Sequence, residues 1–274
     1  MRGILFIAAL FLSSCAQQSI KTKEEVALRN YSSKNDFQLA SVLWYQQSGE
    51  LIALCHQAFK LAKLSLEMKL QQHRKQKNKK LRPAIIIDID ETVLDNSPYQ
   101  AENILHGTRF PIGWNEWMEL AHARAIPGAK SFLKYADSRG VEIFYVTNRQ
   151  TVGLIRTMKN LKDLGIPYKR QNLLLRSGTA SKKERKDFVR KDYDVLLYIG
   201  DNLDDFTDDF EGKSVHDRKI LARKYEGEWG NSLIVLPNPM YGSWEQSVYD
   251  YKPKREENEL MNIRKDYLVP PSKL

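Results

Sequence analysis

Residues 84–96 read AIIIDIDETVLDN. The run opens with the β-branched stretch at 84–87, which is typical of a strand buried on both faces of a sheet. Asp88 and Asp90 follow directly, and two carboxylates at the end of a buried strand are costly to keep charged unless a cation or hydrogen bonds compensate them. Residues two apart in a strand face the same side. Oxygen ligands suit Mg²⁺, so we expect a cation near these aspartates.

Further apolar runs predict the remainder of a sheet. They cover residues 141–146, 173–175, 195–199 and 233–236, and a helical stretch from Val152 to Leu164 follows the first of them. Strands that alternate with helices indicate an α/β fold with a doubly wound, mostly parallel sheet.

The regions around this core are predicted to be helical. Between Asp36 and Lys75 apolar residues recur at helical spacing, with an interruption at Ser48 that could cap a second helix. We expect residues 36–80 to form a helical region that packs with a cap, and residues 97–126 to be the cap insertion in a core spanning 81–265. Residues 266–274 would be a C-terminal tail. The basic run at 74–80 is interpreted as a solvated linker, because no interleaved aromatic residues support nucleic-acid binding.

The N-terminus has the features of a secretion signal. Arg2 supplies a positive charge, and residues 4–12 form an apolar run far shorter than the roughly 20 residues that span a bilayer. The run ends in LSSC, which resembles the lipobox of bacterial lipoproteins. That resemblance implies removal of residues 1–14 and a lipid on Cys15, with 15–35 as a lipidated tether. The alternative is an ordinary signal peptide with an incidental cysteine.

Composition excludes some classes of protein and leaves others open. The 274 residues carry 43 Lys+Arg against 34 Asp+Glu, a net charge of +9 that suits anionic partners without selecting among them. Two cysteines exclude a disulfide-stapled scaffold. Cys55 has Leu51 and Ala58 at helical spacing, so we expect a small core residue rather than a reactive thiol.

Polar residues that follow other predicted strands could form a site that binds a cation and an anion together with Asp88 and Asp90. The stretch at 200–205, GDNLDD, supplies Asp201 and Asp205, which can share a cation with Asp88 if their strands are neighbours. A hydroxyl and an amide that can bind an anion follow Val146, and the stretch SKKER at 181–185 supplies a lysine. These groups suit phosphoryl transfer, which depends on positioning and charge neutralisation.

In this order, these elements resemble the haloacid dehalogenase (HAD) superfamily of phosphotransferases, and more closely the class C nonspecific acid phosphatases. The likeness rests on residues 88–96 and 200–205, and on the phrases AIPGA (125–129), YVTNR (145–149) and YGSWE (241–245). It covers about residues 36–265. Members of that family are bacterial and often outer-membrane lipoproteins, in agreement with the interpretation of Cys15.

The resemblance implies catalytic and metal-binding roles. Asp88 would be the nucleophile that forms an aspartyl-phosphate, and Asp90 the general acid and then the general base. Mg²⁺ would be held by the Asp88 carboxylate, the backbone carbonyl of Asp90 and the carboxylate of Asp201. Asp205 would bind it directly or through water. Asp95 and Asn96 would brace the nucleophile loop.

Phosphate and substrate binding are implied in the same way. Thr147 would donate to a phosphoryl oxygen with Asn148 as a helper, and Lys182 would neutralise the phosphoryl charge. Lys183 is the rival, although its side chain would point elsewhere on a helix. Trp114 and Tyr241 match positions that sandwich the ring of a nucleotide in the family, where stacking contributes about 1–3 kcal/mol per base. Packing within a cap is the alternative, and Trp117 is assigned to packing.

We therefore expect a Mg²⁺-dependent acid phosphatase that is lipid-anchored at the bacterial outer membrane. Its substrates would be small phosphomonoesters such as nucleoside monophosphates, nicotinamide mononucleotide and aryl phosphates. No nucleic acid is expected as a partner, and a homodimer is compatible with the sequence. A surface nucleotide- or haem-binding lipoprotein is the rival, but it predicts loss of Asp88, Asp90 or Lys182, and all three are present. A binder of nucleic acid or anionic surfaces rests on net charge alone.

Overall fold

The computed structural model describes residues 36–75, 81–252 and 257–273. The predicted signal, the tether and Cys15 lie outside these residues. The helices are α2 (Leu39–Gln47), α3 (Gly49–Lys75), α4 (Ser97–Leu105), α5 (Trp114–Leu120), α6 (Ala129–Ser138), α7 (Leu154–Asp163), α8 (Lys183–Asp192), α9 (Val215–Lys224), α10 (Ser243–Val248) and α11 (Glu257–Asp266). The strands are β1 (Arg82–Ile87), β2 (Leu94–Asp95), β3 (Arg124–Ala125), β4 (Glu142–Gln150), β5 (Leu173–Arg176), β6 (Tyr193–Gly200) and β7 (Leu233–Val235).

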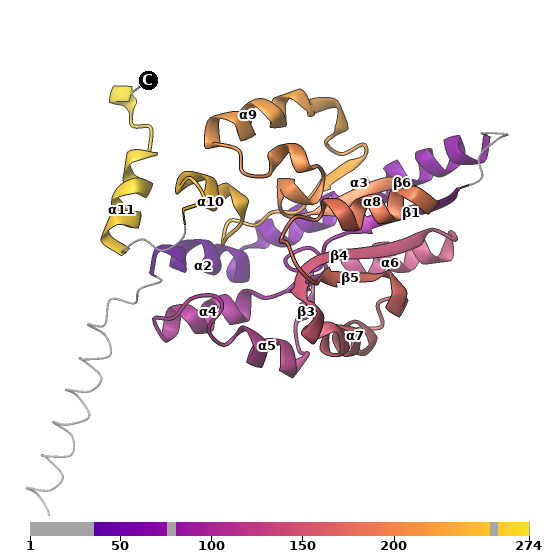
Figure 1. Cartoon of the computed structure of the whole chain (residues 1–274), viewed down its shortest axis with the longest axis horizontal. Helices are drawn as coiled ribbons and strands as arrows, with labels where there is room; N and C mark the ends of the chain where they lie inside the picture. Colours follow the sequence, from indigo (N-terminus) through magenta and orange to yellow (C-terminus); the bar gives the residue numbers. More distant parts are fainter. Residues whose placement is uncertain (1–35, 76–80, 253–256, 274) are drawn as a thin grey trace, which may run out of the picture.

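The five apolar runs predicted to be strands form one parallel sheet in the order β5-β4-β1-β6-β7 (Figure 1). The predicted α/β fold with a mostly parallel sheet is confirmed. β2 and β3 were not predicted; they form a separate antiparallel pair with Leu94 opposite Ala125. This pair joins the two ends of the segment that carries α4 and α5.

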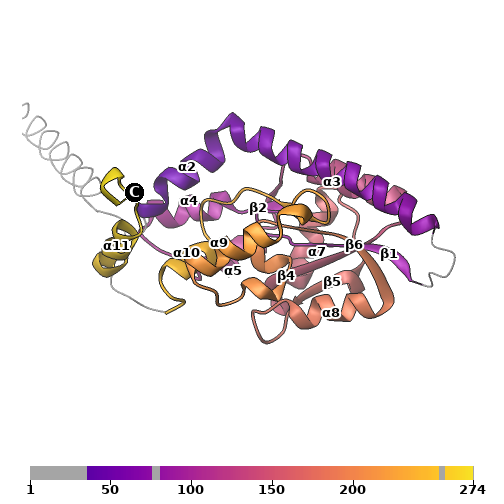
Figure 2. The same ribbon diagram turned by 90° about the horizontal axis from the view of Figure 1, so that it is seen from above.

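Helices cover both faces of the sheet because its central strand is apolar on both sides. Ile85 and Ile87 of β1 face a large core that includes residues of α3 and α6. Ala84 and Ile86 face a smaller core closed by Val189 of α8. Figure 2 shows α3 along one side of the molecule and α8 on the other. Burying each large aliphatic side chain in such a core contributes about 1.5–3 kcal/mol.

The two N-terminal helices pack against different parts of the molecule. α2 contacts α4, whereas α3 packs on α6 and on the strands β6 and β7. Among the stronger contacts, the one with the segment expected to be the cap insertion is therefore made by α2. The break between the helices lies at Ser48, whose Oγ accepts a hydrogen bond from the Leu51 amide at 3.2 Å. Cys55 is fully buried in α3, as the sequence predicted.

A further group of helices lies at the carboxyl-terminal end of the sheet. α2, α4, α10 and α11 lie together at this end of the molecule (Figure 1). Among the described residues, no helix combines the length and the apolar character that crossing a bilayer requires.

Candidate active site

Three neighbouring strands bring the predicted residues together. β1 lies between β4 and β6, so that Ile87 is paired with Tyr145 on one side and with Ile199 on the other. The carboxyl ends of parallel strands meet at one edge, where open α/β sheets bind their ligands. A cleft of about 930 Å³ opens there, and it is lined by Asp88, Asp90, Trp114, Asn148, Lys182, Asp201, Asp205 and Tyr241.

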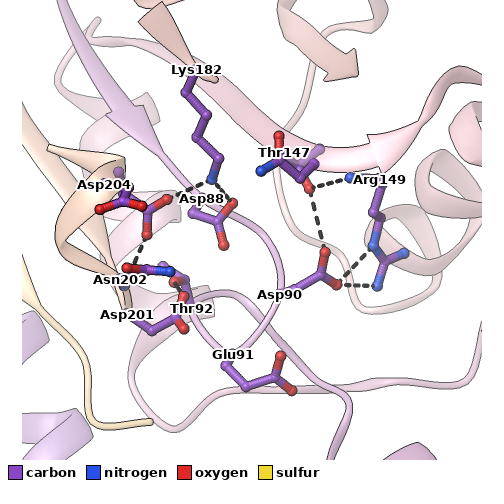
Figure 3. A network of polar contacts seen from close by, with 12 residues as sticks. Asp88, Asp90, Glu91, Thr92, Thr147, Arg149, Lys182, Asp201, Asn202 and Asp204 are labelled. Atoms are coloured by element: carbon purple, nitrogen blue, oxygen red, sulfur yellow. Dashed lines mark hydrogen bonds and ion pairs between the residues drawn. The ribbon is translucent and has the colours of Figure 1, made fainter. Parts of the chain in front are cut away.

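The predicted nucleophile is buried beside a lysine. Asp88 is 6% exposed, and its Oδ1 contacts the Lys182 ammonium, which also lies 2.6 Å from Asp205 Oδ1. Figure 3 shows the Lys182 ammonium pointing towards Asp88. Burial raises the pKa of Asp88 well above its usual value, although the charge of Lys182 opposes the effect. For Lys182, burial favours loss of the proton, but Asp205 and Asp88 outweigh it and raise the pKa.

Three carboxylates converge at this point. One oxygen each of Asp88, Asp201 and Asp205 lie within 4.8 Å of one another. Burial, and then the charge of Asp205, raise the pKa of Asp201 to about 7. One lysine leaves this group short of positive charge, and a set of hard oxygen donors is what Mg²⁺ binds. The residues therefore fit a divalent cation.

The loop after β6 holds Asp201 and Asp205 in place. The Asp201 oxygens accept hydrogen bonds from Thr92 Oγ1 at 3.1 Å and from Asn238 Nδ2 at 2.8 Å. Asp205 Oδ2 accepts a hydrogen bond from the backbone N–H of Asn202 at 3.0 Å. The loop turns so tightly that a Cβ on Gly200 would lie 2.3 Å from Asp205 Oδ2, which only glycine avoids.

Asp90 belongs to a second cluster. Its Oδ1 lies 2.9 Å from Arg149 Nε and 2.8 Å from Arg149 Nη2, and it accepts from Asn96 Nδ2 at 2.9 Å. Its Oδ2 accepts from Thr147 Oγ1 at 3.3 Å. Figure 3 shows this cluster apart from the lysine and its carboxylates. The two aspartates are thus held in different surroundings.

Arg149 is the main residue that the sequence analysis missed. Side chains alternate along β4, so Thr147 and Arg149 are buried while Asn148 between them is exposed. Asn148 lines the cleft, but its Oδ1 accepts from Arg185 Nη2 at 2.8 Å. The same period of two that was applied to Asp88 and Asp90 would have identified Arg149 as a partner of Thr147.

The geometry separates Lys182 from its rival. Lys182 lies just before α8 and is buried in the cleft. Lys183 is exposed and pairs with Asp187 on its own helix at 2.5 Å.

The aromatic residues lie at the cleft wall. Trp114 packs edge-on against Tyr99 and Phe110, with the Arg149 guanidinium 5.7 Å from its ring. Tyr241 donates its hydroxyl to Glu91. Both roles considered for Trp114, packing and contact with a ligand, are compatible with this position.

The bracing residues form a layer beneath the cleft. Trp117 packs on the core and donates from Nε1 to Asn96 Oδ1 at 2.9 Å. The side-chain amide of Asn96 in turn donates to Asp90, and the backbone N–H of Asn96 donates to Glu91 Oε1 at 2.8 Å. Asp95 Oδ1 accepts from the Ser97 amide at 2.8 Å, at the start of α4. Glu91, which the sequence analysis did not single out, is fully buried at a φ of 59°.

A family model agrees with this geometry. Residues 6–244 match the model of the HAD superfamily, subfamily IIIB, described as acid phosphatase. The chain belongs to this family. Two structures of the class C acid phosphatase from Bacillus anthracis, one with tungstate bound, are each 41% identical to it with a TM-score of 0.82. They cover 87% and 86% of this chain, which spans 99% and 98% of theirs.

Curated relatives of the family are more distant. Vegetative storage protein 2 of Arabidopsis thaliana is 26% identical over 165 residues. The match covers 57% of this chain and 55% of that protein, so the chain spans little more than half of its length. The class B acid phosphatase of Rahnella sp. (strain Y9602) is 26% identical over 186 residues, or 61% of this chain and 72% of that protein.

Proposed function

We propose that this HAD-family protein is an acid phosphatase that hydrolyses small phosphomonoesters through an aspartyl-phosphate on Asp88. The observation that carries the proposal is the convergence of Asp88, Lys182 and two further carboxylates in one cleft, with Asp90 held separately at its wall. This arrangement supplies a nucleophile, charge neutralisation and a proton donor, which phosphoryl transfer requires.

In the first step, a carboxylate oxygen of Asp88 attacks phosphorus and the bond to the leaving alcohol breaks. Lys182 lies at Asp88 Oδ1, where it can offset the charge of the phosphoryl oxygens. Thr147 supplies a hydroxyl from within β4, where its side chain is buried. Asn148 is proposed as a helper from the rim, where its amide lines the cleft.

Asp90 would protonate the leaving oxygen and then remove a proton from the water that hydrolyses the aspartyl-phosphate. Its contacts with Arg149 and Asn96 fix the carboxyl group. The Thr147 hydroxyl, which donates to Asp90 in this structure, would turn its single proton to a phosphoryl oxygen when substrate binds. Asp90 is held by residues other than those around Asp88. It can therefore exchange a proton with the leaving group without competing with Asp88 for Lys182.

Asp88, Asp201, Asp205 and the backbone carbonyl of Asp90 would hold Mg²⁺. When bound, the ion supplies positive charge that offsets the repulsion between the Asp88 carboxylate and the phosphoryl group. Asp201 is oriented for this role by Thr92 and Asn238.

Trp114 and Tyr241 are proposed to hold the ring of the leaving group, as in nucleoside monophosphates, nicotinamide mononucleotide and aryl phosphates. Both line the cleft beside Asp88. Stacking on aromatic rings tolerates many bases, so we expect a broad substrate range. We also propose attachment to the outer membrane through a lipid on Cys15.

The test is phosphate release from nucleoside monophosphates and p-nitrophenyl phosphate by residues 16–274, with Mg²⁺ and with EDTA. We expect turnover that EDTA removes and that Asp88→Asn abolishes. The matched control is Asp187→Asn, an acid on the outer surface of α8 that pairs with Lys183. A folded, Mg²⁺-saturated protein that releases no phosphate would refute the proposal.

A further inference from the structure

Arg185 makes an unusual set of hydrogen bonds behind the cleft. Its Nη1 contacts the carbonyl oxygen of Thr147 and lies 3.4 Å from that of Leu174. Its Nη2 donates to Asn148 Oδ1 at 2.8 Å and to the Ser181 carbonyl at 2.9 Å. One side chain of α8 therefore reaches β4, β5 and the loop that precedes its own helix.

Except for Leu174 of β5, the acceptors belong to the segments that carry the proposed phosphate-binding residues. Thr147 supplies the hydroxyl proposed to bind a phosphoryl oxygen, and Ser181 is bonded to the next residue, Lys182. Arg185 itself is not among the residues that line the cleft. Apart from Asn148 Oδ1, the acceptors named here are backbone carbonyl oxygens, which do not depend on the side chains at those positions.

The planar guanidinium suits this task. It presents five N–H groups in a fixed fork, and several acceptors can be held at once with little further loss of conformational freedom. A lysine in the same place has one ammonium group on a flexible stem, so it can reach one or two of these carbonyl groups but cannot hold the three segments in the same geometry.

We infer that Arg185 is a positioning residue that fixes the distance between Thr147 and Lys182, and so the width of the pocket that receives a phosphoryl group. This inference rests on the proposed function, because it assigns Arg185 to the same site. A displacement of about 1 Å in such a pocket can cost about 10²-fold in rate.

The test uses tungstate, a phosphate analogue, as the probe. Its dissociation constant is measured by calorimetry for the wild type, Arg185→Lys and Arg185→Ala. We expect weaker binding by at least tenfold in Arg185→Ala and an intermediate loss in Arg185→Lys. Millimolar guanidinium should restore part of the binding to Arg185→Ala, because it can occupy the space that the side chain left. The control is Arg190→Gln, which removes an arginine from the outer side of the same helix.

Kinetics and stability separate positioning from folding. KM for p-nitrophenyl phosphate should rise in Arg185→Ala while the unfolding midpoint of the variant changes little, and guanidinium should lower KM again. Unchanged tungstate affinity and KM in a folded Arg185→Ala protein would overturn the inference. So would a loss of binding that follows the unfolding midpoint and is not relieved by guanidinium. If the wild type binds tungstate but releases no phosphate from any ester, the proposed function fails and the role of Arg185 in anion binding is still measured.

Discussion

At the scale of single residues, Asp88 and Asp90 lie two positions apart in the chain but have different hydrogen-bond and ion-pair partners. Asp88 lies against a lysine and two acids, whereas Asp90 is held by an arginine, an amide and a hydroxyl. A nucleophile and a proton carrier need different environments, and two positions on one short segment provide both.

This separation predicts how Asp90→Asn will behave. Loss of the general acid should lower kcat/KM on nucleoside 5′-monophosphates by about 10²–10⁴-fold. The loss in the first step should be smaller for p-nitrophenyl phosphate, because p-nitrophenolate leaves without a proton. Stopped-flow absorbance should then show a burst of p-nitrophenolate, since water attack on the aspartyl-phosphate has also lost its base. Equal losses on both substrates without a burst would contradict the role of Asp90.

Cys55 provides a prediction about reactivity. Its thiol is fully buried, and burial raises the pKa to about 12. The thiolate is the reactive form, so iodoacetamide at pH 8 should alkylate the native protein far more slowly than the unfolded protein. Mass spectrometry of residues 16–274, in which Cys55 is the only cysteine, measures both rates. Similar rates before and after unfolding would contradict the burial of this side chain.

Most catalytic candidates could be found in the sequence because they follow recognisable strands. Asp88, Asp201 and Asp205 meet because β1 and β6 are neighbours, and Lys182 reaches them from the position just before α8. Arg149 was missed because the motif was treated as one hydroxyl and one amide without regard to side-chain alternation. Glu91 and Asn238 were missed for another reason: their partners, Tyr241 and Asp201, lie far away in the chain.

At the scale of elements, the β6 loop depends on a glycine for its close approach. A Cβ at Gly200 would lie 2.3 Å from Asp205 Oδ2 and 2.6 Å from Asp205 Cβ, so Gly200→Ala must displace Asp205. We expect Mg²⁺ affinity, measured by calorimetry, to fall at least about tenfold, as a displaced ligand would cause.

Gly227→Ala is the matched control for this substitution. No atom lies within 4 Å of a Cβ built there, so the same change in backbone freedom occurs without a clash. Equal Mg²⁺ affinity in both variants would show that the loop can move without harm to the site.

Strands were predicted correctly where the apolar run in the sequence was long enough to recognise, and they were missed where the strand was only two residues long. The five strands of the sheet carry apolar runs, β-branched in all but β5, that stand out from the helices between them. β2 and β3 have two residues each, and no periodicity can be read from two residues. The packing of α3 could not be read from its sequence either, because an apolar stripe does not specify which surface it covers.

At the scale of the whole molecule, the acidic site lowers stability in the absence of metal. The pKa of Asp201 is about 7 in the folded protein against an ordinary value of 3.8. Between those values the folded protein keeps a proton that the unfolded chain releases, so this group makes the metal-free protein less stable as the pH rises. Above pH 7 the penalty is complete.

Asp201→Asn should therefore be more stable than the wild type in EDTA at pH 8, and the difference should shrink towards pH 4. Saturating Mg²⁺ should reverse the order, because the wild type gains the free energy of metal binding and the variant loses a ligand. Urea denaturation at pH 4, 6 and 8, with Mg²⁺ and with EDTA, measures both effects. A wild type that is more stable than Asp201→Asn in EDTA at pH 8 would contradict the electrostatic argument.

The path of α3 has a practical consequence for anyone who attaches this protein to a surface. Phe37, near the start of the described chain, and Arg264 of α11 both line the cleft, and the Arg264 guanidinium lies 3.6 Å from the Phe37 ring. From there α3 runs to the opposite end of the molecule (Figure 2), about 40 Å for its 27 residues. A bead, dye or electrode linker joined beside Phe37 or to α11 would sit at the mouth of the cleft and obstruct diffusion. Coupling near Lys75 would turn that mouth towards the solution.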